Sequence, residues 1–390
     1  MRVDMYPEQI DVAAFTHINF AFALIDPGTF AVAPMSSNDP SLYTRLTNLK
    51  SANAGLKVFI SIGGWSMNDP DQPTAATFSN LAASTSAQNA FFKSLLSLMS
   101  TYGFDGVDID WEYPVAPERS GIPADFTNYV SFLKNLKAAL TASGHHYGLS
   151  ITIPASFWYL QNFDIVNIEP IIDWFNMMTY DLHGTWDSTD VWIGAIAQAH
   201  TNLTEIDLAM QLLWRNGITP GNVNLGLGFY GRSFTLANPS CQAAGCPFSS
   251  GGNPGPCTVT AGVLSYSEIN DLITAGGVTI TTDTVAAVEI ATWGGNQWVS
   301  YDSVATFKQK VDWANSHCLG GYVLCNKFMI LLICDRTFVW AVSLDDTNGT
   351  AASALSQSTN QITLSELSIS LGSSSDYPGC VITDCAKTCA

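Results

Sequence analysis

The stretch DGVDIDWEYP, residues 105–114, decides how the rest of the chain is interpreted. Three of its acids, Asp108, Asp110 and Glu112, alternate with apolar residues. Alternate side chains of a β-strand face the same side, so three carboxylates share one face of an otherwise apolar strand. Neighbouring carboxylates raise one another's pKa, which keeps one acid protonated near neutral pH and ready to donate its proton. A solvated charge cluster is the plain alternative, but burying three unpaired acids for structure alone is too costly.

Apolar runs typical of strands alternate with helical patterns along the chain. The helical patterns cover 89–102 and 125–140. This alternation predicts βα units and, at 390 residues, an α/β fold of the (β/α)8 TIM-barrel type. Glu112 would then lie near the C-terminal end of its strand, where barrel enzymes hold their sites. The strand-like runs are 17–25, 57–65, 106–114, 147–155, 174–181, 223–231 and a last one beginning at 320–324.

Only seven such runs are evident, so we expect the first barrel strand to be lacking or degenerate. From 234 onward the pattern changes to a short helix followed by antiparallel strands, which predicts a small α+β insertion after strand seven. The expected parts are the first barrel segment 1–233, the insertion 234–302, the last barrel segment 303–350, a Ser/Thr-rich linker 351–379 and a Cys-containing tail 380–390.

Composition limits the partners of the protein. The net charge is -18, with 33 acids against 15 bases, which disfavours nucleic acid and anionic membranes as partners. No run of about 18 apolar residues predicts a membrane span. Only 12% of the residues are charged, which suits a neutral substrate. We expect a monomer that binds neither nucleic acid nor membrane.

The cysteines indicate disulfides rather than a metal site. None of the nine forms a CxxC pair, and no two histidines have zinc-ligand spacing, so we expect no metal and no cofactor. Glycosylation sequons at Asn202 and Asn348 also favour an oxidising compartment. These features predict a secreted, extracellular protein. The first twenty residues hold no signal peptide, so we expect the chain to be N-terminally truncated here. The clustered cysteines are Cys241, Cys246, Cys257, Cys380, Cys385 and Cys389.

Four motifs together resemble the family 18 glycoside hydrolases, the chitinases. DGVDIDWEYP looks like the DxxDxDxE signature of that family, and SIGGW (61–65), MTYD (178–181) and GFYGRSF (228–234) match its motifs on strands three, six and seven. They follow the family's order, and the likeness covers roughly residues 10–350. The phrases MTYDLHGTWD and AHTNLTEI further resemble the secreted fungal group related to killer-toxin subunits.

The resemblance implies retaining, substrate-assisted hydrolysis of β-1,4-linked N-acetylglucosamine in chitin or chitooligosaccharides. Glu112 would protonate the glycosidic oxygen, and the acetamido oxygen of the substrate would be the nucleophile. Asp110 would turn toward Glu112 and the acetamido N–H, while Asp108 would share a proton with Asp110. Tyr180 would align the acetamido oxygen, and Asp181 would hold the same sugar.

Further residues are expected to bind the substrate. Trp65 follows two glycines at a strand end, where a sugar platform is favoured over core packing. Arg232 stands at the mouth of strand seven, where binding competes with simple neutralisation of acids. The expected substrate-binding residues besides Asp181 are Met178, Trp65, Trp340, Tyr230, Arg232 and Trp186.

The last strand departs from the family pattern. LGGYVL is separated from WAVSLDD by residues 325–339, and their removal gives a clean match to the family's last strand, whose Trp would be Trp340. We hypothesise that 325–339 is a retained intron. A genuine loop insertion is the alternative, although the apolar run FMILLI is a poor exposed loop.

Two other functions use the same barrel. A chitin-binding lectin is the first alternative, but loss of the acid is the usual mark of such lectins, and Glu112 is present. An endo-β-N-acetylglucosaminidase acting on N-glycans is the second, and it would use the same acids. The aromatic platforms and the insertion favour linear chitin.

Overall fold

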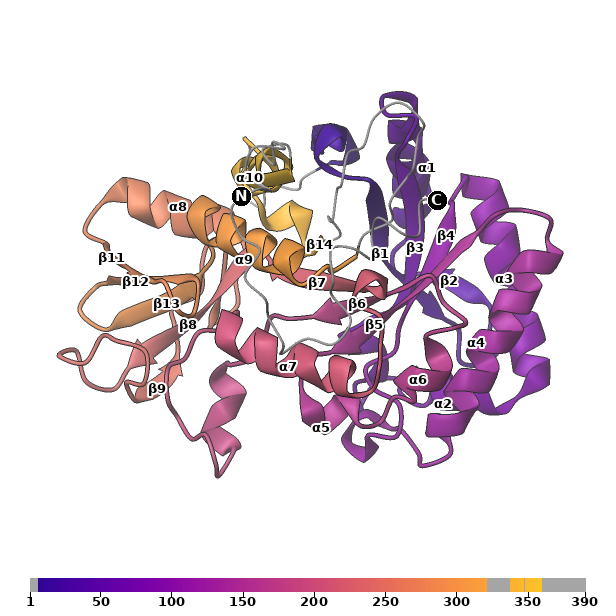
Figure 1. The fold of residues 1–390 in the computed structure, drawn as a ribbon, viewed down its shortest axis with the longest axis horizontal. Coiled ribbons are helices and arrows are strands. Elements are labelled where there is room, and N and C mark those ends of the chain that lie inside the picture. The colour runs from indigo at the N-terminus through magenta and orange to yellow at the C-terminus, as the bar shows by residue number, and fades with distance from the viewer. Residues whose placement is uncertain (1–5, 321–336, 347, 360–390) are drawn as a thin grey trace. The chain divides into compact units, whose positions relative to one another are not determined.

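The computed structural model describes residues 6–320, 337–346 and 348–359. This part of the chain divides into two compact units, whose elements are drawn in Figure 1. We call them the carboxylate unit, residues 6–178 and 208–218, and the insertion unit, residues 179–207 and 219–359 with the gaps just given.

The carboxylate unit is built on a sheet with the strand order β6-β5-β4-β3-β1-β2. Neighbouring strands pair in parallel, except that β2 pairs with β1 antiparallel. Strands β3 to β6 are buried almost throughout, as expected of a parallel sheet rich in Val, Ile and Phe. The strands are β1 (His17–Ile25), β2 (Val32–Pro34), β3 (Lys57–Gly63), β4 (Gly106–Asp110), β5 (Gly148–Pro154) and β6 (Trp174–Met178).

Helices follow these strands and bury their apolar faces. Helix α3 begins after Ser84, whose side chain accepts a hydrogen bond from the backbone of Ala87, and it ends at Gly103 in the left-handed conformation. Figure 1 shows α2, α3 and α4 gathered on one side of this sheet. The helices are α1 (Asp39–Thr47), α2 (Thr77–Ala83), α3 (Thr85–Tyr102), α4 (Asp125–Ala142), α5 (Phe157–Leu160) and α6 (Ile165–Ile168). Helix α7 (Leu203–Arg215) contains the boundary between the units.

The parallel strands agree in number with the sequence. Five lie in the carboxylate unit, and β7 (Val223–Gly228) pairs in parallel with β14 (Thr337–Trp340) in the insertion unit. In the described part of the chain no strand precedes β1, because the residues before it form the short 3-10 helices Pro7–Gln9 and Val12–Ala14.

The partner strand of β7 differs from the prediction. We expected the last strand to begin at 320–324, most of which lies outside the described residues, yet β14 takes the place beside β7. Its first three residues belong to the suspected insertion 325–339, and the rest of that segment also lies outside the described residues. The sequence Thr-Phe-Val-Trp is rich in β-branched and aromatic residues, which favours a strand.

The predicted α+β insertion is present. Its antiparallel sheet has the order β10-β8-β13-β12-β11, with β9 paired to β8, and it packs around Phe234 and Trp298. The sheet includes residues before the expected boundary at 234, because β8 begins at Tyr230. The elements are β8 (Tyr230–Leu236), β9 (Phe248–Gly251), β10 (Val263–Ser265), α8 (Tyr266–Ala275), β11 (Thr279–Asp283), β12 (Val288–Trp293) and β13 (Gln297–Tyr301).

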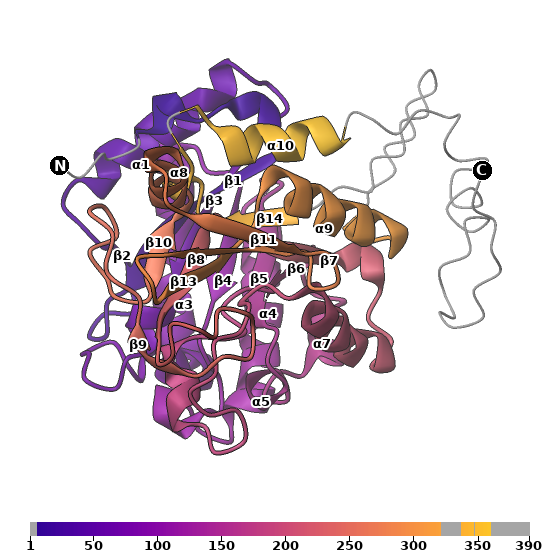
Figure 2. The ribbon, with the colours of Figure 1, turned by 90° about the vertical axis from the view of Figure 1, so that its left-hand side faces the viewer.

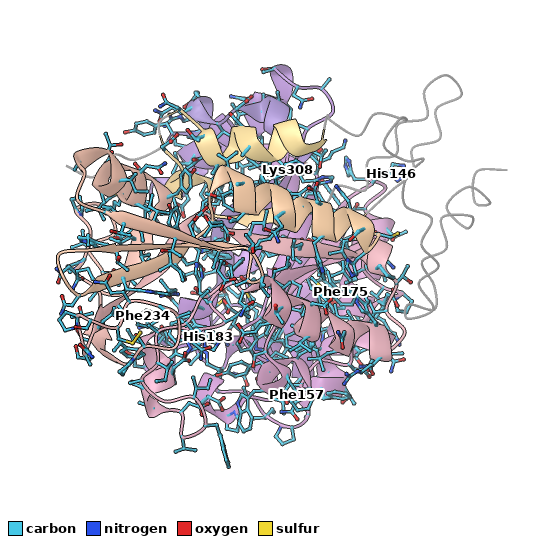
Figure 3. The ribbon with its side chains drawn as sticks, turned by 60° about the vertical axis from the view of Figure 1, so that its left-hand side comes forward. His146, Phe157, Phe175, His183, Phe234 and Lys308 are labelled. Atoms are coloured by element: carbon cyan, nitrogen blue, oxygen red, sulfur yellow. A yellow bond between two sulfur atoms is a disulfide. The ribbon has the colours of Figure 1, made fainter. Side chains whose placement is uncertain are left out.

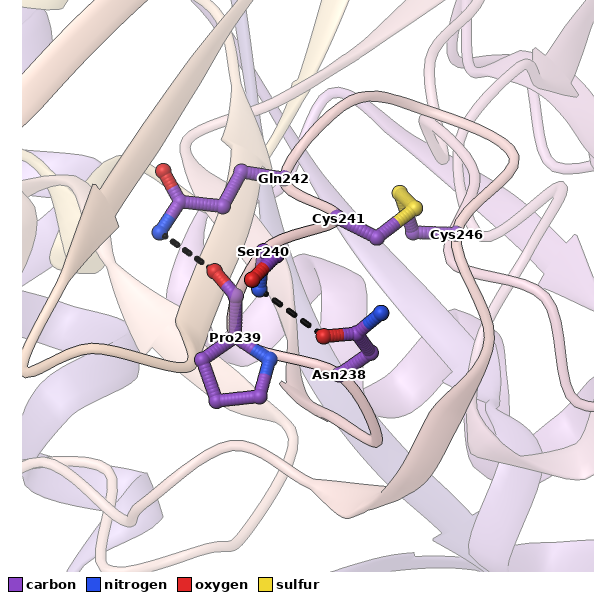
Figure 4. The surroundings of a disulfide bond; sticks show 6 residues. All are labelled: Asn238, Pro239, Ser240, Cys241, Gln242 and Cys246. Atoms are coloured by element: carbon purple, nitrogen blue, oxygen red, sulfur yellow. Dashed lines mark hydrogen bonds between the residues drawn. A yellow bond between two sulfur atoms is a disulfide. The ribbon is translucent and has the colours of Figure 1, made fainter.

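The cysteines of the insertion meet the expectation only in part. Cys241 and Cys246 form a disulfide beside a turn held by Asn238 and Gln242 (Figure 4). Cys257, for which we also expected a disulfide, is a free thiol. Cys380, Cys385 and Cys389 lie outside the described residues.

The expected linker does not begin at residue 351. Residues from that point form helix α10 (Thr350–Thr359), which lies beside α9 (Val304–Ser316) in Figure 2. Asp345 caps α10 by accepting hydrogen bonds from the backbones of Ala351 and Ala352, at 3.0 and 2.9 Å. Alanines and Leu355 supply a buried face, so this Ser/Thr-rich stretch becomes helical through packing. Residues 360–390 lie outside the described part of the chain.

Candidate active site

The three carboxylates of the opening stretch are buried together at the end of β4. Asp108, Asp110 and Glu112 are 2%, 5% and 7% exposed. Asp108 and Asp110 belong to β4, and Glu112 follows two residues beyond its end. The structure therefore confirms a buried stack of acids and excludes a solvated charge cluster.

Asp108 is held by four side-chain donors from the neighbouring strands. Ser61 on β3 and Ser150 on β5 donate to it at 2.7 Å each. Thr152 on β5 donates at 3.1 Å, and Asn176 on β6 donates at 3.0 Å. These bonds satisfy both carboxylate oxygens, so they offset the free-energy cost of burying this acid and fix the position of its side chain beside Asp110.

Asp110 contrasts with Asp108. Burial, followed by the charges of Glu112 and Asp108, raises the pKa of Asp110 well above its usual value. In the described part of the chain its buried Oδ1 has no hydrogen-bond partner. Asp110 therefore lies in the middle of the stack with a raised pKa, which favours its protonated form, and with one uncommitted oxygen.

The backbone of Glu112 contacts an arginine, and the next residue, Tyr113, packs against an aromatic ring. Burial and the charges of Glu112 and Asp110 raise the pKa of Tyr113, so its phenol stays protonated. The backbone carbonyl of Glu112 accepts a hydrogen bond of 3.0 Å from Nε of Arg119. Tyr113 also stacks on Tyr159, with ring centroids 4.2 Å apart.

The two glycines before Trp65 let β3 pass very close to β4. Gly63 and Gly64 have φ of 120° and 86°, and a Cβ on Gly63 would lie 2.0 Å from the carbonyl oxygen of Asp110. Trp65 then opens a 3-10 helix and remains 50% exposed. This exposure excludes core packing of the Trp65 ring, and its role as a sugar platform stays a prediction.

A second group of predicted residues lies in the insertion unit around Asp181. Arg232 donates to Asp181 from Nε at 2.7 Å and from Nη2 at 2.6 Å, and the hydroxyl of Tyr230 donates at 2.7 Å. Burial alone would raise the pKa of Asp181, but His200 and Arg232 outweigh it and hold that pKa well below the usual range. Asp181 also has a left-handed φ of 58°, so its backbone is strained at this position.

Two aromatic residues accompany this second group. Tyr180 is buried, with its ring near Tyr230 and Phe338, at centroid distances of 6.2 and 5.9 Å. Trp186 is 44% exposed, and the guanidinium of Arg232 lies 4.8 Å from its ring centroid. Arg232 thus contacts both the carboxylate of Asp181 and the indole ring of Trp186.

His183 braces the loop that carries Trp186. Its two ring nitrogens lie 2.8 Å from Asp187 and 3.0 Å from Glu205. Burial opposes protonation of His183, but the two carboxylates outweigh it and raise its pKa to about 9. The side chain is labelled in Figure 3, where Phe234 marks the core of the same unit.

The predicted residues thus fall into two groups, one in each unit. The carboxylate unit holds the acids, Trp65 and half-buried Met178 at the end of β6. The insertion unit holds the rest, including half-buried Trp340 at the end of β14. No group of three or more His, Cys, Asp or Glu in the described residues could hold a metal ion.

Sequence reasoning missed several residues of these groups. We assigned no role to any histidine, yet His200 contacts Asp181 and the carbonyl of Tyr230. Arg119 was also missed. Neither residue carries a local signal, because both reach the site from loops. The donors to Asp108 did carry a local signal, because they are polar residues within apolar strands. They are Ser61, Ser150, Thr152 and Asn176.

Comparison with known protein families decides what these groups belong to. The model of the glycosyl hydrolases family 18 matches residues 3–326. The chain belongs to the glycosyl hydrolases family 18. The resemblance indicated by the four sequence motifs is therefore confirmed.

Curated relatives of this family 18 chain include fungal and animal proteins. Secreted chitinase LysM12 of Penicillium expansum is 32% identical over 335 residues, covering 81% of this chain and 22% of the relative. Killer toxin subunits alpha/beta of Kluyveromyces lactis are 35% identical over 276 residues, covering 70% and 23%. Chitotriosidase-1 of Mus musculus is 29% identical over 361 residues, covering 89% and 70%. The chain thus spans less than a third of these fungal relatives.

Solved family 18 structures share the fold. Ostrinia furnacalis Group IV chitinase in complex with allosamidin has a TM-score of 0.77 at 26% identity, covering 91% of this chain and 92% of that one. Cycas revoluta GH18 chitinase in complex with (GlcNAc)3 has a TM-score of 0.74 at 27% identity, covering 90% and 95%. These matches confirm the predicted α/β class of the TIM-barrel type. Among the helices of the described residues, none has the length and apolar character of a membrane span.

Proposed function

We propose that this family 18 member hydrolyses β-1,4 bonds between N-acetylglucosamine units of chitin, with retention of configuration. The observation that carries the proposal is the buried stack of Asp108, Asp110 and Glu112, in which the pKa of Asp110 is raised and both carboxylate oxygens of Asp108 accept hydrogen bonds. Several relatives are named chitinases, and solved neighbours hold chitooligosaccharides, which supports the choice of substrate.

Glu112 is the proposed general acid and base. It first donates its proton to the glycosidic oxygen as the leaving sugar departs, and it later accepts a proton from the attacking water. Retaining glycosidases usually have a second protein carboxylate as the nucleophile, but family 18 enzymes are substrate-assisted. The acetamido oxygen of the sugar attacks its own anomeric carbon and closes an oxazolinium ring, which water then opens.

Asp110 is proposed to serve the acetamido group. With its proton shared toward Asp108, Asp110 accepts a hydrogen bond from the acetamido N–H and stabilises the positive charge that develops in the ring. Its uncommitted Oδ1 makes such a new hydrogen bond possible without breaking an existing one. Asp108, fixed by four donors, remains in place throughout.

Tyr180 and Asp181 are proposed to position the same sugar. The hydroxyl of Tyr180 donates to the acetamido oxygen and aligns it for attack, while Asp181 accepts from a sugar hydroxyl. The low pKa of Asp181 keeps it an acceptor at any working pH. Tyr230 and Arg232 hold Asp181 from the other side.

Apolar and aromatic side chains are proposed to bind the sugar rings. Trp65 and Trp186 expose ring surface that suits stacking on pyranose rings. Trp340 supplies the floor beneath the sugar that is cleaved, and Met178 contacts its acetamido methyl group. We further propose that the protein is a secreted fungal enzyme that acts as a monomer, in keeping with relatives named as secreted chitinases.

A pair of substrates tests the substrate-assisted mechanism. The N-acetylglucosamine hexamer and its fully deacetylated counterpart have the same glycosidic bonds, but only the first carries the nucleophile. We expect cleavage of the acetylated hexamer alone, measured by chromatography of the products. Equal cleavage of both would contradict the proposal. Binding of the acetylated hexamer without any cleavage would favour a chitin-binding lectin.

A further inference from the structure

Arg119 connects the general acid to an aromatic platform. It lies on the 3-10 helix Pro117–Arg119 in the loop after β4 and is only 4% exposed. Its Nε donates to the carbonyl of Glu112 at 3.0 Å, and its Nη2 donates to the carbonyl of Trp65. Its guanidinium also lies 3.7 Å from the ring centroid of Trp65. One side chain thus contacts the backbone of Glu112 and both the backbone and the ring of Trp65.

The positive charge of Arg119 is neutralised by one carboxylate. Its Nη1 donates to Asp69 at 2.8 Å, and Asp69 ends the short helical turn that Trp65 begins. Three nitrogens of the planar guanidinium therefore have three different partners, while its face covers the Trp65 ring. A lysine has one ammonium group and no planar face, so it could not maintain this set of contacts.

We propose that Arg119 is a positioning residue that fixes Trp65 relative to Glu112, so that a sugar stacked on Trp65 presents its glycosidic oxygen to the acid. This inference rests on the proposed function. Trp65 keeps half of its surface exposed although Arg119 covers part of the ring, which leaves ring surface for the sugar. The ring of Tyr113, the residue after Glu112, packs edge-on against the ring of Trp65, with the ring centroids 6.4 Å apart. This contact limits the rotation of Trp65 on that side.

The geometry predicts two separable effects of removing the guanidinium. Losing its contacts with Trp65 loosens the platform and raises KM. Losing the hydrogen bond to the Glu112 carbonyl displaces the acid and lowers kcat, because small errors of position at a reacting centre cost up to about a hundredfold in rate. A purely structural role would lower the temperature of unfolding without changing either constant.

The test is a double-mutant cycle in the full chain, with the N-acetylglucosamine hexamer as substrate. We expect Trp65→Ala to raise KM by about tenfold, and Arg119→Met to raise KM similarly and to lower kcat by about ten- to a hundredfold. In the double variant KM should rise little beyond that of Trp65→Ala, because Arg119 acts on KM through Trp65. The kcat loss should persist in the double variant.

Arg45 offers a matched control in the same unit. It too pairs with a carboxylate, Glu8, and covers an aromatic ring, that of Tyr6, at 4.7 Å. Arg45→Met should leave KM and kcat unchanged. Multiplied KM effects in the double variant, or an Arg119→Met that changes only the unfolding temperature, would overturn the proposal.

Calorimetric binding of the hexamer separates this inference from the proposed function. If the unaltered chain binds but does not cleave, the proposed hydrolysis fails. Arg119 is then still supported if Arg119→Met weakens binding only when Trp65 is present, and overturned if it does not. Absence of any binding by the unaltered chain would overturn both.

Discussion

Arg232 grips Asp181 with two parallel hydrogen bonds, from Nε to Oδ1 at 2.7 Å and from Nη2 to Oδ2 at 2.6 Å. Tyr230 adds a third bond to Oδ1 at 2.7 Å. These contacts hold the pKa of Asp181 far below its usual range, although burial acts in the opposite direction. The residue next to Tyr180 is therefore a fixed anion, and the proposed sugar contacts depend on it.

Replacing Arg232 by lysine should lower kcat/KM for the hexamer by about ten- to a hundredfold. Lysine keeps the charge, but it cannot form the two-bond geometry with Asp181 or cover Trp186, which is worth about 1.5–3 kcal/mol. Tyr230→Phe removes one hydrogen bond and should have a smaller effect. Steady-state kinetics with the hexamer measure both effects. A larger loss of kcat/KM for Tyr230→Phe than for Arg232→Lys would contradict this ranking.

Replacing Asp110 by asparagine should abolish most activity and change how stability depends on pH. Burial and the neighbouring acids raise the pKa of Asp110 in the folded chain above its unfolded value. The folded state therefore holds a proton that the unfolded state releases, and stability falls as pH rises above about 4 toward the folded pKa. Asparagine does not titrate, so the Asp110→Asn variant does not lose stability in this way.

Thermal unfolding between pH 4 and pH 8 checks this expectation. The advantage of Asp110→Asn over the unaltered chain should be smallest at pH 4 and grow with pH. The exposed Asp190→Asn is a control that leaves the stacked acids unchanged. A constant difference between Asp110→Asn and the unaltered chain across the range would contradict a raised pKa.

Replacing His183 by glutamine should remove stability mainly at neutral and acidic pH. The folded pKa of about 9 exceeds the usual 6.5, so the charged histidine stabilises the fold fully below pH 6.5, and this contribution is lost as pH rises through 9. The shift corresponds to at most about 3 kcal/mol. Urea unfolding at pH 6 and pH 9.5 measures it.

The control for this variant is His145→Gln, at an exposed position. It should change the free energy of unfolding at neither pH. If His183→Gln loses as much stability at pH 9.5 as at pH 6, the ion pairs with Asp187 and Glu205 are not the source of its contribution.

Removing residues 325–339 should leave a chain that folds and cleaves the hexamer at least as well as the chain given. The deletion joins LGGYVL to WAVSLDD and offers β7 a continuous apolar partner that ends near Trp340. Activity and the temperature of unfolding are the measurements. An aggregated or inactive product would favour a genuine insertion, and sequencing of the mature transcript would refute a retained intron if the corresponding codons remain.

Much of the fold follows from local patterns in the sequence. The run 17–25 coincides with β1 because its alternation suits a strand, and 125–140 lies within α4 because its apolar spacing suits a helix. The acids of 105–114 were found for the same reason, since their period of two is itself the evidence of a strand face. These features need no knowledge of distant contacts.

Other features depend on contacts that no local pattern reveals. Arg119 and His200 reach their partners because loops bring them there, and neither has a distinctive neighbourhood in the sequence. The expected linker began at residue 351 because Ser and Thr are frequent there, yet packing of a few alanines and the cap by Asp345 make residues 350–359 a helix. The pairing of residues 337–340 with β7 is likewise a contact between distant parts of the sequence, which no local pattern reveals.

The central claim is that Glu112 drives retaining cleavage of chitin chains, and proton NMR of freshly released products tests it most directly. With the N-acetylglucosamine hexamer, the unaltered chain should release the β-anomer first, before mutarotation. Glu112→Gln should bind the hexamer and release almost nothing. Initial release of the α-anomer, or undiminished cleavage by Glu112→Gln, would contradict the account.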